Sequence, residues 1–245
     1  MAATVALRME IASLGDSALV VRITNDFAAA PEESLRTVRA AHAAIEAAAI
    51  PGIVECTSAY ASVGVFFDPK QLPRVQGSGK DPFDCLVDQL RTAVSLPPAS
   101  SAPILEAPLR EVPVCYDAEF AFDLGAVTAH TGISADQVVS LHAGSEYRVY
   151  CVGFMPGFPY LGGLPPELAT PRRKTPRTAV PAGSVAIGGA QTGIYPATSP
   201  GGWNVIGRTP LRLFDPVANP PARFRPGDRV RFVAITRAQF DRAAA

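Results

Sequence analysis

Hydrophobic positions in the first hundred residues follow two different periods, and together they predict a strand–helix–strand–strand–helix order. Short apolar runs predict strands at residues 18–23, 53–60 and 62–68. Apolar residues three and four positions apart predict helices at residues 31–50 and 81–94. The βαββα order is typical of a ferredoxin-like α+β sandwich, which is the fold class that we expect for this part of the chain.

The pattern changes in the second half. Residues 109–116 predict a strand that either completes the first sheet or opens the next domain. Two short helices are predicted at residues 122–130 and 134–144, and the second begins with a capping box formed by Ser134 and Gln137. After these helices, short apolar runs separated by glycine and proline are typical of a β-barrel or sandwich, with strands expected at residues 146–153, 183–189, 193–196, 203–207, 210–214 and 228–235.

Proline marks the boundary between the two halves. Nineteen of the 24 prolines lie at residue 97 or later, and the first cluster of them falls within residues 96–109. Such a segment is typical of a linker between domains. We therefore expect a ferredoxin-like domain at residues 1–97, a proline-rich linker at 98–108 and a β-barrel domain at 109–245.

Charge and cysteine usage narrow the functional classes. Lys and Arg together number 22, as do Asp and Glu, so no net charge attracts nucleic acid or an anionic membrane surface. No run of 18 apolar residues predicts a membrane span. The four cysteines lie about thirty residues apart without a CxxC motif, which is typical of thiols in a reducing cytoplasm.

Three motif-like features are weak. The helices within residues 122–144 imitate a helix-turn-helix, but the second has no Lys or Arg to neutralise phosphates. "QGSGKD" (residues 76–81) lacks the first glycine and the Ser or Thr of a P-loop. The three histidines do not predict a metal site. His142 lies near the end of a short helix, where the helix dipole favours imidazolium, and we keep it as a candidate catalytic residue.

"GFMPGFPYLGGL" (residues 153–164) combines stiffness with apolar side chains. Pro156 and Pro159 argue against both a helix and a central strand. We expect an apolar loop that is either purely structural or lines a groove or a subunit interface. The buried area would come from Phe154, Phe158 and Tyr160.

The segment 170–210 contains the strongest candidate chemistry. Four cations occur within six positions, namely Arg172, Arg173, Lys174 and Arg177. Guanidinium groups bind carboxylate or phosphate through paired hydrogen bonds, and glycines allow close backbone approach. We favour a small-molecule anion site over a solvated basic loop. Arg177 is the first choice for the anion ligand, and we expect it to contribute little to folding. Hydrogen-bonding and stacking groups follow it at Gln191, Tyr195, Ser199, Trp203 and Asn204.

The sequence from "YRVYCVGFMPGFPYLGG" to "GGWNVIGRTPLRLFDP" resembles the family of the B subunit of bacterial 5-oxoprolinase, whose members are also labelled allophanate hydrolase subunit 1 or kinase-inhibitor family. Upstream, "GDSALVV", "PGIVECTSAYASVGVFFDP" and "VPVCYDAEFAFDL" fit the same family, so the resemblance covers nearly the whole chain. It implies an N-terminal ferredoxin-like domain followed by a cyclophilin-like β-barrel.

The resemblance also implies a cytoplasmic enzyme subunit. It would act with the C and A subunits of 5-oxoprolinase to open 5-oxo-L-proline to L-glutamate with ATP hydrolysis, and would be inactive alone. ATP is the implied co-substrate, with Mg²⁺, whereas the chain lacks the Ala-Met-Lys-Met of a biotin acceptor.

On this basis we expect catalytic roles for Arg177, Arg173, Gln191 and His142, and no metal ligands. The substrate-binding candidates are Arg172, Phe154, Pro156, Phe158, Tyr160, Ser184, Tyr195, Ser199, Trp203 and Arg208. Two other functions stay open: a binding module that inhibits a sensor histidine kinase, and an allophanate- or urea-related carboxyltransferase-type subunit.

Overall fold

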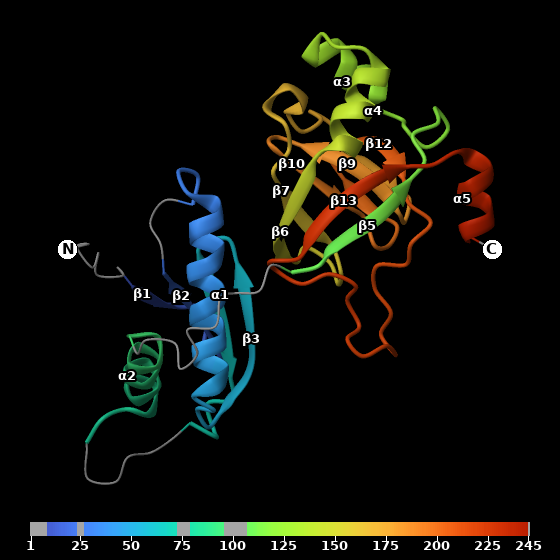
Figure 1. The fold of residues 1–245 in the computed structure, drawn as a ribbon. Coiled ribbons are helices and arrows are strands. Elements are labelled where there is room, and N and C mark those ends of the chain that lie inside the picture. Colours follow the sequence, from blue (N-terminus) through green and yellow to red (C-terminus); the bar gives the residue numbers. More distant parts are fainter. Residues whose placement is uncertain (1–8, 24–26, 73–78, 96–106, 245) are drawn as a thin grey trace. The chain divides into compact units, whose positions relative to one another are not determined.

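The protein consists of two compact units, residues 1–105 and 106–245, in a computed structural model that describes residues 9–23, 27–72, 79–95 and 107–244 (Figure 1). Each unit combines helices with a mainly antiparallel sheet, so the chain is an α+β protein. Most of the expected linker at 98–108 and the first half of the "QGSGKD" loop lie outside the described residues.

Unit 1 contains a four-stranded antiparallel sheet and two helices. In spatial order, the strands are β1 (Glu10–Ser13), β2 (Ala18–Arg22), β4 (Ser62–Phe67) and β3 (Ile53–Ala59), and the helices are α1 (Pro31–Ala47) and α2 (Pro82–Ser95). β4 lies between β2 and β3, which α1 connects. The sheet and both helices share one core, including Leu19, Val38, Val63, Val65 and Leu86.

Local signals explain the boundaries of these elements. The backbone N–H of Phe83 donates to the Asp81 carboxylate at 2.8 Å, so Asp81 caps the start of α2. Tyr60 lies in the turn between β3 and β4, and its φ of 50° lets the chain reverse direction there. The exposed, polar strand β1 was not predicted, and it occupies the sheet edge beside β2.

Unit 2 is a closed barrel. Its strands are, in spatial order, β5 (Leu109–Val114), β13 (Arg229–Ala234), β6 (Glu146–Val152), β7 (Pro159–Gly162), β10 (Gln191–Ile194), β9 (Ser184–Gly188) and β12 (Asn204–Arg208). β5 and β13 are parallel, and the other neighbours are antiparallel. An isolated bridge between Cys115 and Arg208, with hydrogen bonds of 2.8 and 2.9 Å, joins the two ends of this path. The strand after the proline-rich segment therefore opens the second unit.

Helices α3 (Leu124–Thr131) and α4 (Ala135–Gly144) lie at one end of the barrel in Figure 1. Both sides of the predicted capping box at the start of α4 are present. Val127 of α3 and Val138 of α4 are fully buried with barrel residues such as Val149 and Ile187. The two helices thus pack on the barrel through these buried side chains.

Two expectations for unit 2 are wrong. Residues 153–164 are not all loop, because β7 pairs with β6 and β10 over Pro159–Gly162. Pro159 is tolerated there because it is the first residue of the strand. Residues 210–214 form no strand, and only Phe214 makes an isolated bridge, to Ala222.

Four further elements of unit 2 were not predicted. A two-stranded ribbon pairs β8 (Arg177–Val180) with β11 (Ser199–Gly201). A single turn of 3-10 helix, η1, spans Pro166–Leu168, and helix α5 spans Arg237–Ala244.

The barrel wall around β9 is buried on both faces, which determines where the candidate site lies. Val185 and Ile187 belong to the barrel core, whereas Ala186 between them packs in a second cluster on the opposite face. Val180 of the β8–β11 ribbon belongs to this second cluster, so the ribbon helps to cover the outer face of the wall.

Candidate functional site

Five aromatic side chains predicted as site residues gather on this outer face. Phe158 is the centre: its ring centroid lies 4.8 Å from that of Tyr160, 5.2 Å from Tyr195, and 5.6 Å from both Trp203 and Phe154. Most of these contacts are edge-to-face, an arrangement that aromatic rings favour. We refer to Phe154, Phe158, Tyr160, Tyr195 and Trp203 as the aromatic cluster.

Glycines in the neighbouring strands provide the space for these rings. A Cβ on Gly188 would lie 2.4 Å from the Trp203 ring, and one on Gly201 would lie 2.4 Å from the Tyr195 hydroxyl. A Cβ on Gly193 would lie 2.9 Å from the Phe158 ring. We expected the glycines to admit close backbone approach, and here the groups that approach are the protein's own aromatic rings.

The loop between β6 and β7 presents Phe154 to solvent. Phe154 has a φ of 69°, which is uncommon for a bulky residue, and is 64% exposed. Backbone hydrogen bonds of 3.1 Å, from Gly153 to Phe158 and from Phe158 to Met155, close the loop around exposed Pro156. The structure therefore holds an aromatic ring outward at the edge of the cluster.

Arg172 adds a positive charge to the aromatic cluster. Its guanidinium carbon lies 5.8 Å from the centre of the Trp203 ring, a cation–π contact. Burial raises the pKa values of Tyr160 and Tyr195, and the charge of Arg172 opposes both shifts. At neutral pH both phenols are protonated, so each can donate a hydrogen bond. The arrangement offers a cation and the partly buried Tyr160 hydroxyl beside the exposed Phe154 ring, which suits an anionic or carbonyl-bearing ligand.

The other two arginines of the segment bind a carboxylate of the protein itself. Asp123, immediately before α3, is almost fully buried and accepts hydrogen bonds from Arg177 Nη1 at 2.5 Å and Nη2 at 2.9 Å. It also accepts from Arg173 Nη1 and from the Val205 backbone N–H at 2.8 Å. We call Asp123, Arg173 and Arg177 the Asp123 clamp.

The clamp changes the roles expected for Arg173 and Arg177. We expected Arg177 to reach an external anion and to matter little for folding, but its bidentate partner is internal. Sequence reasoning missed Asp123, because nothing in the sequence shows that a carboxylate before a short helix meets cations fifty residues downstream. Its only local signal was its position in the first turn of the helix predicted at residues 122–130.

His142 lies in the barrel core and away from the aromatic cluster. Its ring nitrogens are 2.8 Å from the Tyr116 hydroxyl and 3.0 Å from the Thr192 hydroxyl, and the ring stacks on Phe232. Complete burial lowers its pKa to about 3. The expected imidazolium is therefore wrong, because burial outweighs the helix dipole, and the structure gives no support for a catalytic role of His142.

The remaining candidates are dispersed around the barrel wall. Arg208 Nε donates to the Ala182 carbonyl at 2.8 Å, and its guanidinium lies over Phe120. Ser184 and Ser199 are buried in strands β9 and β11, and half-exposed Gln191 begins β10. Ser184 meets the aromatic cluster through backbone atoms, since the Tyr195 N–H donates to the Ser184 carbonyl at 2.9 Å. These contacts build the barrel wall and give no direct support for substrate binding by Arg208 or Ser184.

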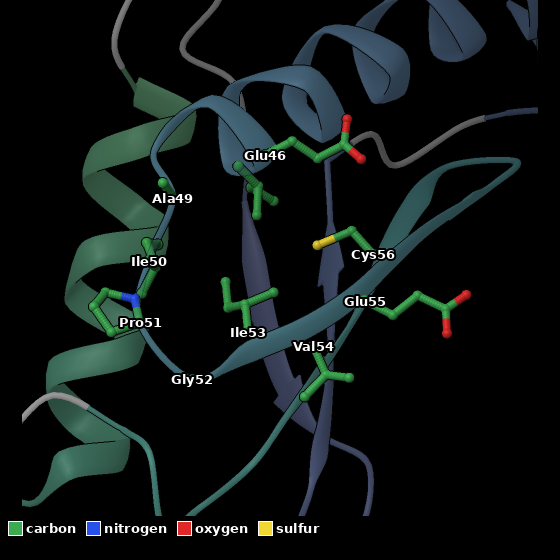
Figure 2. A pocket seen from close by; sticks show the side chains of 10 residues that line it. Glu46, Ala49, Ile50, Pro51, Gly52, Ile53, Val54, Glu55 and Cys56 are labelled. Carbon is green, nitrogen blue, oxygen red and sulfur yellow. The ribbon is translucent and has the colours of Figure 1, made fainter.

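A pocket of about 350 Å³ lies in unit 1, between the end of α1 and the start of β3. Figure 2 shows the Cys56 thiol pointing inward, whereas the Glu46 and Glu55 carboxylates extend away from it. Burial, together with the charges of Glu46 and Glu55, raises the pKa of Cys56 to about 11, so the thiol stays protonated and unreactive. No predicted site residue lines this pocket.

Two other kinds of site have no counterpart in the part of the chain that the structure describes. Within residues 9–23, 27–72, 79–95 and 107–244, no group of three or more His, Cys, Asp or Glu side chains could hold a metal ion. In the same ranges, no helix has both the length and the apolar character that crossing a bilayer requires.

Comparison with known proteins covers almost the whole chain. Residues 9–224 match the family described as carboxyltransferase domain, subdomain C and D. The chain is 41% identical over 233 residues to the B subunit of 5-oxoprolinase from Bacillus subtilis (strain 168), covering 94% of each chain.

Solved structures share the fold. The crystal structure of TTHA0988 matches 89% of this chain with a TM-score of 0.72 and 36% identity, and the match spans only 40% of that longer chain. The urea carboxylase of Kluyveromyces lactis matches 96% of this chain with a TM-score of 0.73. Since its identity is 19% and the match covers 22% of its length, it shows a common fold alone.

Proposed function

The chain belongs to the family of 5-oxoprolinase B subunits, within the carboxyltransferase subdomain C and D family, and we propose on this premise that it is a subunit of an ATP-dependent 5-oxoprolinase. The 41% identity over 94% of both chains is the observation that carries this proposal. The complex would convert 5-oxo-L-proline, ATP and water to L-glutamate, ADP and phosphate. The C and A subunits of 5-oxoprolinase are its proposed partners, and the isolated chain is inactive.

The chemistry of this reaction explains what the subunit must supply. The lactam amide of 5-oxoproline is unstrained and a poor electrophile, so water does not open it readily. Phosphorylation of the amide oxygen by ATP creates a leaving group, and charge develops on oxygen atoms during that transfer. Fixed hydrogen-bond donors and cations near those oxygens lower the barrier.

The aromatic cluster and Arg172 form the substrate-binding face in this proposal. The exposed ring of Phe154 and the partly buried ring of Tyr160 provide apolar surface for the lactam ring, and Arg172 pairs with the substrate carboxylate or with a phosphate. The Tyr160 hydroxyl is an additional donor. Arg173 and Arg177, which we first expected at the anion, instead hold the segment that carries Arg172.

ATP enters this scheme as a co-substrate, and Mg²⁺ would accompany its phosphates. Among the described residues no group of three or more His, Cys, Asp or Glu side chains could hold a metal ion, and we propose no Mg²⁺ ligand from this chain.

We further propose that the two units are a ferredoxin-like domain at residues 1–97 and a cyclophilin-like barrel at 109–245. In unit 1 the strand order β2–β4–β3, with α1 crossing over β4, supports a split βαβ arrangement. In unit 2 the closed path of strands supports a barrel. A cytoplasmic location agrees with four free cysteines.

The test is reconstitution with purified C and A subunits, followed by an assay of ATP-dependent glutamate release from 5-oxoproline. We expect activity only when all subunits are present. Replacing Arg172 by Ala removes a charge-assisted hydrogen bond of about 1.5–3 kcal/mol, so kcat/KM should fall roughly 10- to 150-fold. Arg172→Lys should restore little, because an ammonium group cannot reproduce the planar guanidinium.

Arg36→Ala is the matched control, because Arg36 is an exposed arginine of unit 1 and should leave kcat/KM unchanged. Glutamate release by the isolated chain, or failure to bind the C subunit, would contradict the proposed dependence on partners. A reconstituted complex that acts on allophanate or urea but not on 5-oxoproline would reject the proposed substrate.

A further inference from the structure

We propose that Asp123 is a positioning residue for the substrate-binding face: its buried carboxylate fixes Arg172 over Trp203. This inference rests on the proposed function only for the identity of the ligand. The geometric part, that Asp123 determines where Arg172 lies, concerns the chain alone and can be tested without the enzyme complex.

Hydrogen bonds join the two segments on both sides of the Arg172–Trp203 contact. The Arg173 backbone N–H donates to the Gly202 carbonyl at 2.7 Å, and Asn204 Nδ2 donates to the Pro171 carbonyl at 2.9 Å. Residues 171–173 and 202–204 therefore run side by side, with Arg172 and Trp203 in the middle. The register of these segments sets the position of the guanidinium on the indole ring.

Asp123 binds both segments at once. It accepts from the Arg173 guanidinium on one segment and from the Val205 backbone N–H, at 2.8 Å, just beyond the other. The Asp123 backbone N–H also donates to the Val205 carbonyl at 2.8 Å. Its carboxylate is 2% exposed, so water competes little with these bonds. One buried side chain thus connects the start of α3, the arginine segment and β12.

Charge explains why this position needs a carboxylate. Arg172, Arg173, Lys174 and Arg177 lie within six residues and repel one another. Asp123 pairs with Arg173 and Arg177, which leaves exposed Arg172 and Lys174 facing solvent. Because Arg172 alone of these two contacts the aromatic cluster in the described structure, it is the cation that a ligand on that face would meet.

Trp203 is the only tryptophan of the protein, so its fluorescence reports on this contact directly. The test compares quenching by iodide, an anion, with quenching by neutral acrylamide. A unit charge about 6 Å away changes the local concentration of a monovalent anion in water by about threefold. Arg172→Ala should therefore lower the iodide-to-acrylamide quenching ratio by up to about threefold in the otherwise unchanged protein.

The decisive measurement is a double-mutant cycle between Arg172→Ala and Asp123→Asn. Asp123→Asn alone removes a negative charge, and the cycle cancels that direct effect. If Asp123 positions Arg172, then Arg172→Ala should change the quenching ratio little in the Asp123→Asn protein. An equal effect of Arg172→Ala in both proteins would overturn the proposal, even if Asp123→Asn lowers the melting temperature.

A second variant keeps the test decisive if the Asp123→Asn protein does not fold. Arg173→Gln removes the charged hydrogen bond from residues 171–173 to Asp123, yet it leaves the bidentate Arg177–Asp123 pair in place. The same loss of the Arg172 effect is expected there, and its persistence would also overturn the proposal. Glu146→Gln is the matched control: it breaks a bidentate pair with Arg229 at 2.6 and 2.7 Å elsewhere in unit 2 and should preserve the full Arg172 effect.

The assembled complex provides a readout in the reaction itself. Asp123→Asn and Arg172→Ala should change the same kinetic parameter, KM or kcat, in the same direction, and the double variant should resemble Arg172→Ala alone. If the complex has no 5-oxoprolinase activity, the proposed function fails, whereas the quenching cycle still decides the role of Asp123.

Discussion

The contact with Asp123 gives Arg177 a structural role in place of the expected role as an anion ligand. Its two hydrogen bonds to Asp123 make it part of a buried ion pair, and its side chain is 26% exposed. Removing one partner of a buried pair leaves an uncompensated charge, which costs more than an exposed pair contributes.

We therefore expect Arg177→Ala to lower the free energy of unfolding by about 3 kcal/mol, toward the lower end for a buried pair because Arg173 still binds Asp123. Chemical denaturation of the isolated chain measures this change. Arg231→Ala is the control, since the Arg231–Glu111 pair is about half-exposed and should contribute about 1 kcal/mol or less. Equal losses in the two variants would show that the clamp contributes no more than a surface ion pair.

For single residues, the sequence predicted which side chains would belong to the candidate site. It did not predict which other residues of the protein they would contact. Phe154, Phe158, Tyr160 and Trp203 were identified from their motifs, and the structure brings them together with Arg172. The internal carboxylate was missed because contacts between distant residues depend on strand order. His142 was misjudged because its burial in the barrel core is not visible from its place in a helix.

Among the helices and strands, the glycine-containing strands of unit 2 pack most closely against the aromatic side chains. Gly188 of β9 lies beneath Trp203, and a Cβ there would approach the indole ring to 2.4 Å. The contact is with a buried ring that other aromatic side chains surround, so the ring cannot move aside freely.

Gly188→Ala should destabilise the protein by about 1–3 kcal/mol through overpacking and should shift the emission maximum of Trp203. Thermal unfolding and tryptophan emission spectra measure both effects. Gly125→Ala in α3 is the matched control: no atom lies within 4 Å of its Cβ position, and alanine at a compatible site is neutral or stabilising by up to about 1 kcal/mol. An unchanged Trp203 emission maximum in Gly188→Ala would contradict overpacking, because it would show that the site accommodates the added methyl group.

Elements with strong local signals were predicted well. The helices at α1, α2 and α4 have apolar periodicity together with start signals, and β2, β4 and β13 are largely apolar runs. Short elements were predicted wrongly because contacts with distant parts of the chain, rather than local sequence, determine whether they form. β7 begins at a proline and ends at a glycine, and α5 buries only Phe240. Residues 210–214 alternate like a strand, yet they find a single bridge partner.

For the whole molecule, the separation of the cores is the main feature. Every residue of one core belongs to unit 1, whereas the barrel core and the aromatic cluster belong to unit 2. Alternating patterns and the proline distribution were sufficient to expect two units. The closure of the barrel could not be foreseen, because it depends on a bridge between Cys115 and Arg208, far apart in the sequence.

Separate cores lead us to expect that a defect in one unit leaves the other folded. Leu86 of α2 is fully buried in unit 1, and Leu86→Ala should destabilise that unit by about 2–5 kcal/mol. In denaturant titrations, circular dichroism should then show an early transition that the fluorescence of Trp203, in unit 2, does not. Coincident transitions in both signals would mean that the units unfold as one.

The parallel pairing of β5 with β13 has a consequence for how the chain folds during its synthesis on the ribosome. Glu111 and Arg231, paired across these strands, are 120 residues apart in the chain. Unit 1 can close as soon as α2 has emerged, because all its partners precede that point. The barrel, in contrast, cannot seal its first strand until the last has been translated, so the nascent second unit exposes an unpaired strand edge throughout most of its synthesis. Contacts of such long sequence separation also form slowly, which makes this interval the period when the chain most needs protection from aggregation.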